Sequence, residues 1–177
     1  MTLKFIMVQL LSIIAWALLI YSYYRENKKE ILFYQIVAAL LYSLHYYFLG
    51  AYSGLYICVF EIVRGYLYFV TDDEKDKYIF LCSLPVYGVL VGYMYKNIYD
   101  LFPIISCMLA GWSLTKKRNV IIFCAVIEYT LWVIYDIKVK SYSGIFTDGT
   151  VALANLILLF DKRIFKDDKK LSSLFNK

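Results

Sequence analysis

Glu61 and Arg64 carry opposite charges, three residues apart, inside an apolar segment long enough to cross a membrane. On a helix this spacing places both side chains on one face, close enough to pair. A charge at the centre of a bilayer costs about 2.5–3.5 kcal/mol on insertion scales, so such residues mark candidate functional sites. Two interpretations follow: the pair lines the path of a solute, or it is a structural ion pair that fixes one helix to a neighbour.

Glu128 lies near the middle of another apolar segment and has no charged neighbour at helical spacing. It therefore needs a partner from a different helix, and Arg64 is the one cation inside the predicted spans. Alternatively, Glu128 keeps its proton. A protonated carboxyl suits either proton-coupled transport or a hydrogen-bonded structural role.

Further candidates are single polar residues in other apolar segments. Asp148 and Asn155 are seven residues apart and share one face of a predicted helix. His45, the single histidine, lies near the end of its segment. There we expect a packing residue at the membrane interface, with a role in binding or titration as the alternative. Asp136 lies beside two lysines and is expected to be a solvated interface charge.

No catalytic or metal-binding motif is present in the sequence. It has no G-x-S-x-G, no H-E-x-x-H and no P-loop, and its single histidine excludes a site with several histidines. Four cysteines lie in apolar segments without metal-binding spacing: Cys58, Cys82, Cys107 and Cys124. We therefore expect no enzyme, no cofactor and no metal site.

The elements that position these residues are membrane-spanning helices. Hydrophobic residues make up 62% of the chain and charged residues 19%, against roughly 45–50% and about 25% in soluble domains. This excludes a soluble enzyme and a disordered tail, and it predicts an all-α polytopic membrane protein. Seven spans are predicted, of which the third and the seventh are the shortest and most polar: residues 3–24, 31–49, 55–70, 78–94, 98–114, 120–137 and 145–160.

The basic residues divide unevenly between the two sides of the predicted membrane protein. Four lie on the side of the N-terminus and fourteen on the side of the C-terminus. Because cytoplasmic loops carry an excess of Lys and Arg, we expect the N-terminus outside and the C-terminus in the cytoplasm. Segment 161–177 is then a basic cytoplasmic tail, and the net charge of +5 requires no nucleic-acid partner.

An internal repeat appears when the sequence is shifted by 90 positions. The shift aligns Tyr52-Ser53-Gly54 with Tyr142-Ser143-Gly144, each at the turn before a predicted span. It predicts two parallel three-helix repeats joined by a linker helix, with an axis along the membrane normal. The predicted divisions are a first bundle (1–70), an acidic loop and linker helix (71–97), a second bundle (98–160) and the tail (161–177).

Nearly the whole chain resembles the YgjV family of bacterial inner-membrane proteins. The resemblance rests on residues 9–35, 44–54, 111–113 and 132–135, on Arg64 and Pro103, and on the pair Ser143-Gly144. That family is similar to the SWEET and PQ-loop superfamily of 3+1+3 carriers, although the Pro-Gln pair of the PQ-loop branch is absent here. The resemblance implies a solute held by polar residues of spans three and seven and aromatics of spans two and six, where Tyr42 and Trp132 stand.

These observations favour a carrier or facilitator for a small polar solute, such as a sugar, vitamin or metabolite, working by alternating access. The alternative is a receptor, scaffold or accessory protein on the same fold. The expected partners are the solute and the lipid of the bacterial plasma membrane, and association between copies of the chain stays open. The candidate solute-binding residues are Glu61, Arg64, Trp132, Asp148, Asn155, Tyr42, Glu128 and His45.

Overall fold

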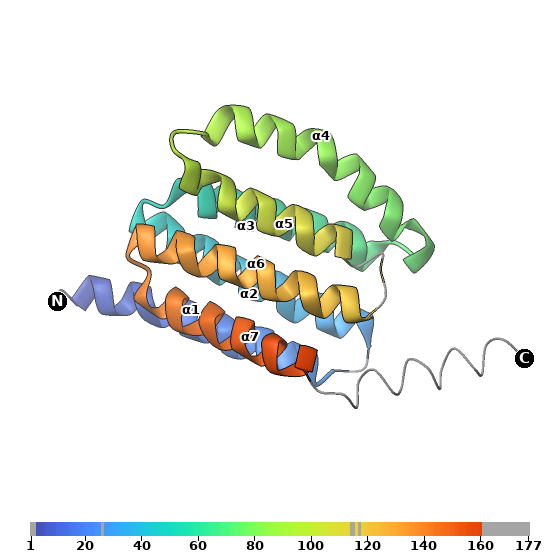
Figure 1. Ribbon diagram of the computed structural model, residues 1–177, viewed down its shortest axis with the longest axis horizontal. Coiled ribbons are helices and arrows are strands. Elements are labelled where there is room, and N and C mark those ends of the chain that lie inside the picture. The colour runs from blue at the N-terminus through green and yellow to red at the C-terminus, as the bar shows by residue number, and fades with distance from the viewer. Residues whose placement is uncertain (1–2, 26, 114–115, 117, 161–177) are drawn as a thin grey trace, which may run out of the picture.

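The computed structural model describes residues 3–25, 27–113, 116 and 118–160. This part of the chain forms a bundle of seven α-helices and two short 3-10 helices (Figure 1). The elements are α1 (Leu3–Tyr23), α2 (Lys28–Leu49), α3 (Tyr52–Val70), η1 (Asp73–Lys75), α4 (Asp76–Met94), η2 (Ile98–Asp100), α5 (Leu101–Ser113), α6 (Arg118–Val139) and α7 (Tyr142–Phe160). The predicted tail 161–177 lies outside the described residues.

The helices form two layers, with α4 along one edge (Figure 1). In one layer α2 packs between α1 and α3, and in the other α6 packs between α5 and α7. Between the layers α1 packs on α7 and α3 packs on α5, while α4 packs against α3 and α5. Successive α-helices run in opposite directions, so α1 begins at one end of the bundle and α7 ends at the other (Figure 1).

Several helix ends follow from local capping chemistry. The side chain of Asn27 accepts a hydrogen bond from the backbone N–H of Lys29 at the start of α2. Gly50 ends α2 with a φ of 70°, a left-handed conformation that glycine adopts without a steric penalty. Asn97 and Asp100 form a reciprocal capping box at η2. These caps satisfy backbone groups that would otherwise be costly near a lipid phase.

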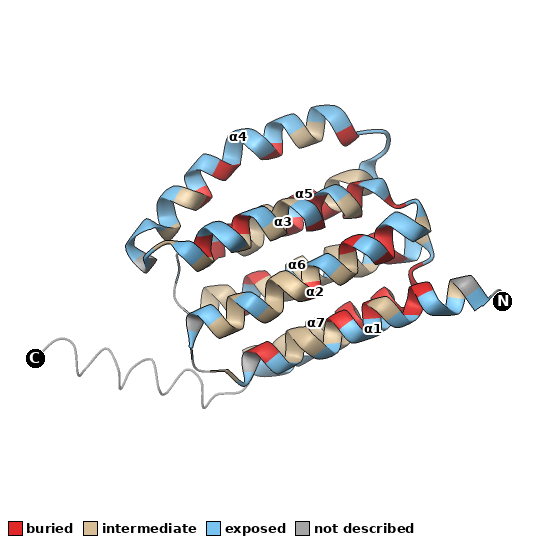
Figure 2. Cartoon of the chain, turned by 180° about the vertical axis from the view of Figure 1, so that it is seen from behind, coloured by how far each residue is buried: buried red, intermediate tan, exposed pale blue. Residues whose placement is uncertain are grey.

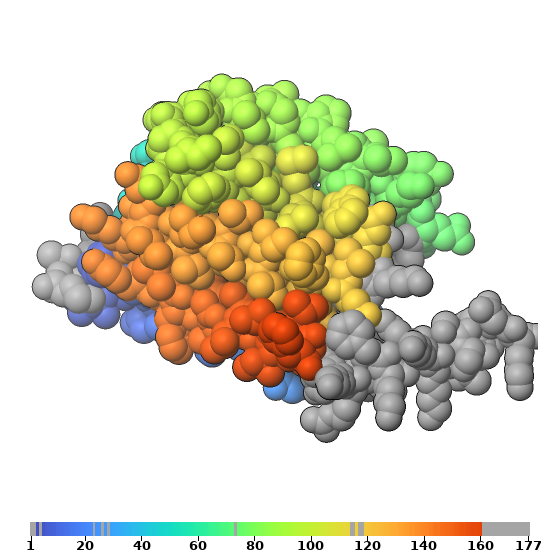
Figure 3. All heavy atoms as spheres, viewed as in Figure 1, coloured from blue at the N-terminus to red at the C-terminus, as the bar shows by residue number. Residues whose placement is uncertain are grey.

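Apolar side chains cover the outside of the bundle, while many polar side chains are buried inside it. Figure 2 shows how buried and exposed residues are distributed along the helices. Phe33, Val89 and Ile157 are more than half exposed, whereas Ser12 and His45 are fully buried. On the face seen in Figure 3, the side chains of α4, α5, α6 and α7 form one closely packed surface. This distribution suits a bilayer, where lipid covers the apolar surface and the interior can hold polar groups.

Six described helices are long and apolar enough to cross a membrane, namely α1, α2, α3, α4, α6 and α7. The predicted order of lengths is wrong, because α3 and α7 have 19 residues each and α5, with 13, is the shortest. α3 and α7 start earlier than predicted because the polar Tyr-Ser-Gly triplets are their first turns. The fifth predicted span is shorter because it begins with η2, and its residue 114 lies outside the described residues.

The bounds of two helix pairs repeat at a spacing of 90 residues. α6 begins and ends 90 residues after α2, and α7 begins and ends 90 residues after α3. The same spacing separates the two Tyr-Ser-Gly triplets, each of which begins its helix. The second and third helices of each half of the chain therefore have equal lengths and equal connections.

Candidate functional site

One face of α3 carries its buried residues, and we call it the inner face of α3. Polar side chains share this face with the core residues Ile57 and Cys58. The buried residues of α3 are Ser53, Gly54, Ile57, Cys58, Arg64 and Tyr68. They recur at intervals of about three to four residues, the spacing of one stripe along a helix. Glu61 lies on the same stripe, with a side chain that is 30% exposed. The stripe faces the other layer, because Arg64 contacts α5 and Ser53 contacts α6.

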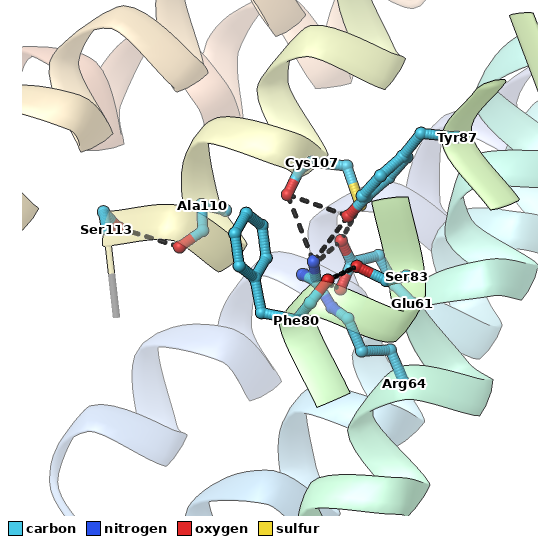
Figure 4. Close-up of polar contacts among 8 residues, drawn as sticks. All are labelled: Glu61, Arg64, Phe80, Ser83, Tyr87, Cys107, Ala110 and Ser113. Carbon is cyan, nitrogen blue, oxygen red and sulfur yellow. Dashed lines mark hydrogen bonds and ion pairs between the residues drawn. The ribbon is translucent and has the colours of Figure 1, made fainter. Parts of the chain in front are cut away.

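Arg64 is the centre of a polar network that we call the arginine cluster, formed by Glu61, Arg64, Tyr87 and Cys107 (Figure 4). Its Nη2 donates to both carboxylate oxygens of Glu61 at 2.7 Å. Its Nη1 donates to the Tyr87 hydroxyl at 2.6 Å and to the backbone oxygen of Cys107 at 3.2 Å. The Cys107 thiol donates to Glu61. The predicted Glu61–Arg64 pair is thus confirmed. The bonds of Arg64 to Tyr87 and Cys107 connect α3 to α4 and α5.

One N–H of Arg64, that of Nε, has no acceptor among the described residues. Arg64 is 5% exposed. Glu61 is more exposed than Arg64, so a polar group entering the bundle would reach the carboxylate first. A solute oxygen could replace one hydrogen bond of the guanidinium while the other bonds still neutralise it.

Gly111 of α5 allows Arg64 to approach the helix backbone. A Cβ at this position would lie 2.5 Å from Nη1 of Arg64 and 2.9 Å from the Phe80 ring. We therefore expect Gly111→Ala to destabilise the protein by about 1–3 kcal/mol, as overpacking does. Gly88→Ala on α4 is the control, because its methyl group meets nothing within 4 Å. Equal melting temperatures of the two variants in detergent would contradict this packing.

Glu128 of α6 is not an ion-pair partner of Arg64 among the described residues, since the guanidinium pairs with Glu61 of its own helix. Glu128 instead lies at longer electrostatic range from Glu61, Arg64 and Asp148. The expectation that Arg64 balances Glu128 directly is therefore not met. Glu128 thus interacts electrostatically with both the arginine cluster and Asp148 without pairing with Arg64.

A second buried group, the carboxyl cluster, consists of Tyr46, Asp136 and Asp148 where α2, α6 and α7 meet. The Tyr46 hydroxyl donates to Oδ1 of Asp136 at 3.0 Å. The side chains of Asp136 and Asp148 face each other within hydrogen-bonding reach. The expectation that Asp136 is solvated is wrong, because the residue is 0% exposed. Its carboxyl group lies inward against Gly144 of α7 rather than outward beside the lysines.

His45 is also fully buried, near the end of α2, and both of its ring nitrogens have hydrogen-bond partners, so the expected packing role is confirmed. Its Nδ1 lies 2.7 Å from the backbone oxygen of Val8, and its Nε2 lies 2.8 Å from Oγ of Ser141. A backbone oxygen only accepts, so Nδ1 carries the proton and Nε2 of the neutral ring accepts from Ser141. His45 thereby links α1 and α2 to the residue before α7.

The other candidates separate into two groups. The Trp132 ring of α6 stacks on Tyr46, with centroids 5.6 Å apart, and so lies beside the carboxyl cluster. Tyr42, one turn before Tyr46, interacts with Asp148. Asn155 does not join them, since its Nδ2 donates to the backbone of its own helix at 2.9 Å. The structure therefore brings Tyr42, Trp132 and Asp148 together and leaves Asn155 apart.

Sequence reasoning missed Tyr87 and Cys107 of the arginine cluster and Asp136 of the carboxyl cluster. Tyr87 is one of 19 tyrosines, and nothing in its own spacing distinguishes it from a packing residue. Cys107 contributes partly through its backbone oxygen, which carries no sequence signal. Asp136 did have a signal, because the 90-residue shift pairs it with Tyr46 inside a helix rather than with a loop residue.

Pockets open at both ends of the inner face of α3. The tyrosine pocket, of about 520 Å³, lies at the start of α3 and is lined by Ser53, Tyr56, Lys96, Tyr99, Asp100 and Tyr135, among others. The opposite pocket, of about 800 Å³, is lined by Asn27, Lys29, Tyr68, Phe69, Thr71, Asp72 and Glu74. Ser53 and Tyr68, near the two ends of the stripe, each line one pocket. In the described part of the chain, no three His, Cys, Asp or Glu side chains meet as metal ligands would.

A bundle of membrane-length helices with a polar interior defines a polytopic membrane protein. Residues 6–163 match the model of the bacterial inner membrane protein family Imp-YgjV, and the chain belongs to this family. The match confirms the resemblance to that family and the location in the inner membrane. No curated protein and no solved structure matches the chain.

Proposed function

We propose that this protein is a carrier that moves a small polar solute across the inner membrane along the inner face of α3. One observation carries the proposal: the inner face of α3 has a pocket at each end and the charged pair Glu61–Arg64 between them. A helix that only anchors a protein in lipid does not need polar groups along its length. Aromatic rings beside charged and hydroxyl groups favour a sugar, vitamin or metabolite as the solute. The proposal includes no catalytic step.

We further propose a 3+1+3 layout, in which α1–α3 and α5–α7 form two related bundles and α4 links them. The equal bounds of α2 and α6, and of α3 and α7, support this layout. So does the hydrogen bond between Tyr46 and Asp136, which are 90 residues apart. Residues that occupy the same position in two repeats and touch each other are expected beside a twofold axis.

Contacts between the first helix of one bundle and the last helix of the other support the same layout. Oε1 of Gln9 in α1 accepts from the backbone N–H and the hydroxyl of Ser143 in α7, at 2.9 and 2.6 Å. Asp100 of η2 accepts from the Ser53 hydroxyl of α3 at 2.9 Å. Ser53 and Ser143 are again 90 residues apart. Both contacts lie at the end of the bundle where α3 and α7 begin (Figure 1), so rocking that opens this end would break them, as alternating access requires.

Uptake into proteoliposomes tests the carrier function. The reconstituted protein is given a mixed pool of labelled polar metabolites, and we expect at least one class to enter faster than into empty liposomes. Glu61→Gln should slow this uptake. Tyr66→Phe should not, because Tyr66 is 58% exposed and lies on the opposite side of α3. If no solute moves under a gradient, the carrier proposal fails and a receptor, scaffold or accessory protein is favoured.

The proposed orientation places the N-terminus and the tyrosine pocket outside and the C-terminus in the cytoplasm, because basic residues favour the cytoplasmic side. A reporter fused after Lys177 should therefore be active in the cytoplasm, and a tag before Met1 should be accessible from outside. Finding both ends on one side would contradict seven crossings. In that case α5, the shortest helix, would be the one that does not cross.

A further inference from the structure

Two carboxyl groups are buried between α6 and α7, and no cationic partner for them is found in the described part of the chain. Asp136 is 0% exposed and Asp148 is 7% exposed, and their side chains face each other within hydrogen-bonding reach. Neither forms an ion pair with a Lys or Arg among the described residues. Two adjacent carboxylates repel each other, and burial without a counter-charge makes a second negative charge costlier still. The pair is therefore best occupied by one proton.

The backbone of α7 explains why the two groups meet. A Cβ on Gly144 would overlap Oδ2 of Asp136, so this carboxyl group lies directly against the helix surface. Asp148 is one turn further along α7, and helical side chains lean back toward the preceding turn. Its carboxyl group therefore reaches the same turn that Asp136 covers. Gly144 provides the space in which the two carboxyl groups touch.

The hydrogen bonds around Asp136 leave one oxygen without a donor. Oδ1 accepts from Tyr46, but Oδ2 has no partner in the described part of the chain. With His45 neutral, the nearby hydroxyl of Ser141 donates to Nε2 of His45 at 2.8 Å, and its one proton is then not available to Oδ2. A proton on Asp148 would supply the missing donor as an O–H···O bond to Asp136.

The groups that face the pair from the neighbouring helices supply no positive charge. They are Tyr42, His45 and Tyr46 of α2, Cys58 of α3 and Glu128 of α6, together with the uncharged Gln9 of α1. The Tyr46 ring also touches Tyr135, with centroids 5.8 Å apart, and Tyr135 lines the tyrosine pocket. The rings of Tyr46 and Tyr135 therefore separate the pair from the water of the tyrosine pocket.

We propose that Asp136 and Asp148 share one exchangeable proton and that the carrier couples solute movement to the transfer of this proton across the membrane. The coupling rests on the proposed carrier function. The pair takes one proton from water on one side and releases one proton to water on the other side, and no other bond changes. The tyrosine pocket provides the nearer access, and Glu128 lies within electrostatic range of both the pair and the arginine cluster.

Infrared spectroscopy tests the shared proton without any solute. In protein with isotope-labelled aspartate carboxyl groups, we expect the band of a protonated acid at neutral pH, when exposed aspartates are ionised. Asp136→Asn and Asp148→Asn should each remove the band, and Asp72→Asn, at an exposed residue, should leave it unchanged. If the wild-type protein lacks the band, the shared proton is refuted whether or not a solute is transported.

The coupling is tested with a solute found in the uptake experiment. An imposed pH gradient should drive accumulation by the wild-type protein. Asp136→Asn should lose this accumulation yet still exchange labelled for unlabelled solute, because its amide can donate to Asp148 in place of the shared proton while its oxygen still accepts from Tyr46. Wild-type uptake that ignores the pH gradient would overturn the coupling and leave the carrier function intact. If no solute moves at all, the carrier function and the coupling fall together, and the infrared band alone decides the shared proton.

Discussion

Arg64→Ala is expected to cost about 3 kcal/mol of the free energy of unfolding, the lower end of the range for breaking a buried ion pair, because Glu61 is 30% exposed. The loss has two sources. The Glu61 carboxylate remains without its charge partner, and the Tyr87 hydroxyl and the Cys107 backbone oxygen lose a donor. The melting temperature in detergent and the yield of monodisperse protein should both fall.

Arg25→Ala is the matched control for this prediction. Arg25 also pairs with a glutamate, Glu30, at 2.6 Å, but the two side chains are 37% and 44% exposed. Exposed ion pairs contribute little because water and salt screen them. The melting temperature of Arg25→Ala should therefore stay close to that of the wild-type protein.

A double variant separates structure from transport at the arginine cluster. Combining Arg64→Ala with Glu61→Gln removes both charges, so part of the lost stability should return. If the pair only fixes the helices, uptake should return as well. We expect the double variant to fold and remain inactive, because we propose that the pair lies on the solute path. Unchanged stability and uptake in Arg64→Ala alone would contradict the described cluster.

Gly144→Ala should be the most harmful glycine substitution in α7. Its methyl group would overlap the carboxyl group of Asp136 and the hydroxyl of Ser141, both fully buried. Neither group can move freely, since Tyr46 holds Asp136 and His45 holds Ser141. Overpacking of this kind costs about 1–3 kcal/mol, occasionally more.

Gly149→Ala tests whether that loss comes from the carboxyl cluster rather than from α7 in general. Its methyl group would lie 3.9 Å from Val133, an ordinary contact. Since alanine favours helix over glycine by about 1 kcal/mol, this variant should match or exceed the wild-type melting temperature. Equal losses in both variants would show that Gly144 does not contact Asp136 as described.

The membrane-spanning helices were predictable because lipid requires long apolar runs, which are visible in the sequence. The starts of α3 and α7 were not, because their first turns are polar triplets whose serines and glycines are buried by contacts from other helices. Glu61 and Arg64 could be paired from their spacing, since both lie on one helix. Tyr87 and Cys107 join them from α4 and α5, and spacing within a helix says nothing about such neighbours.

Asp136 and His45 illustrate the same limit for burial. Both lie near helix ends, where sequence position alone favours contact with water. Their orientation is set by the rotation of α2 and α6 about their axes, which follows from packing on Gly54 and Gly144. In each case the 90-residue repeat carried more information than the local sequence, because it pairs His45 and Asp136 with the buried tyrosines Tyr135 and Tyr46.

We propose that the inner face of α3 lines a path that opens to each side of the membrane in turn. Accessibility of single cysteines to a membrane-impermeant thiol reagent tests it most directly, in a variant whose other cysteines are replaced by serine. Native Cys58 and Ile57→Cys, both on the buried stripe, should react in intact cells and in inverted vesicles. Val63→Cys and Tyr66→Cys, on the exposed opposite side, should stay unreacted because lipid covers them. Protection of Cys58 and position 57 from both sides would show a closed structural core and contradict the account.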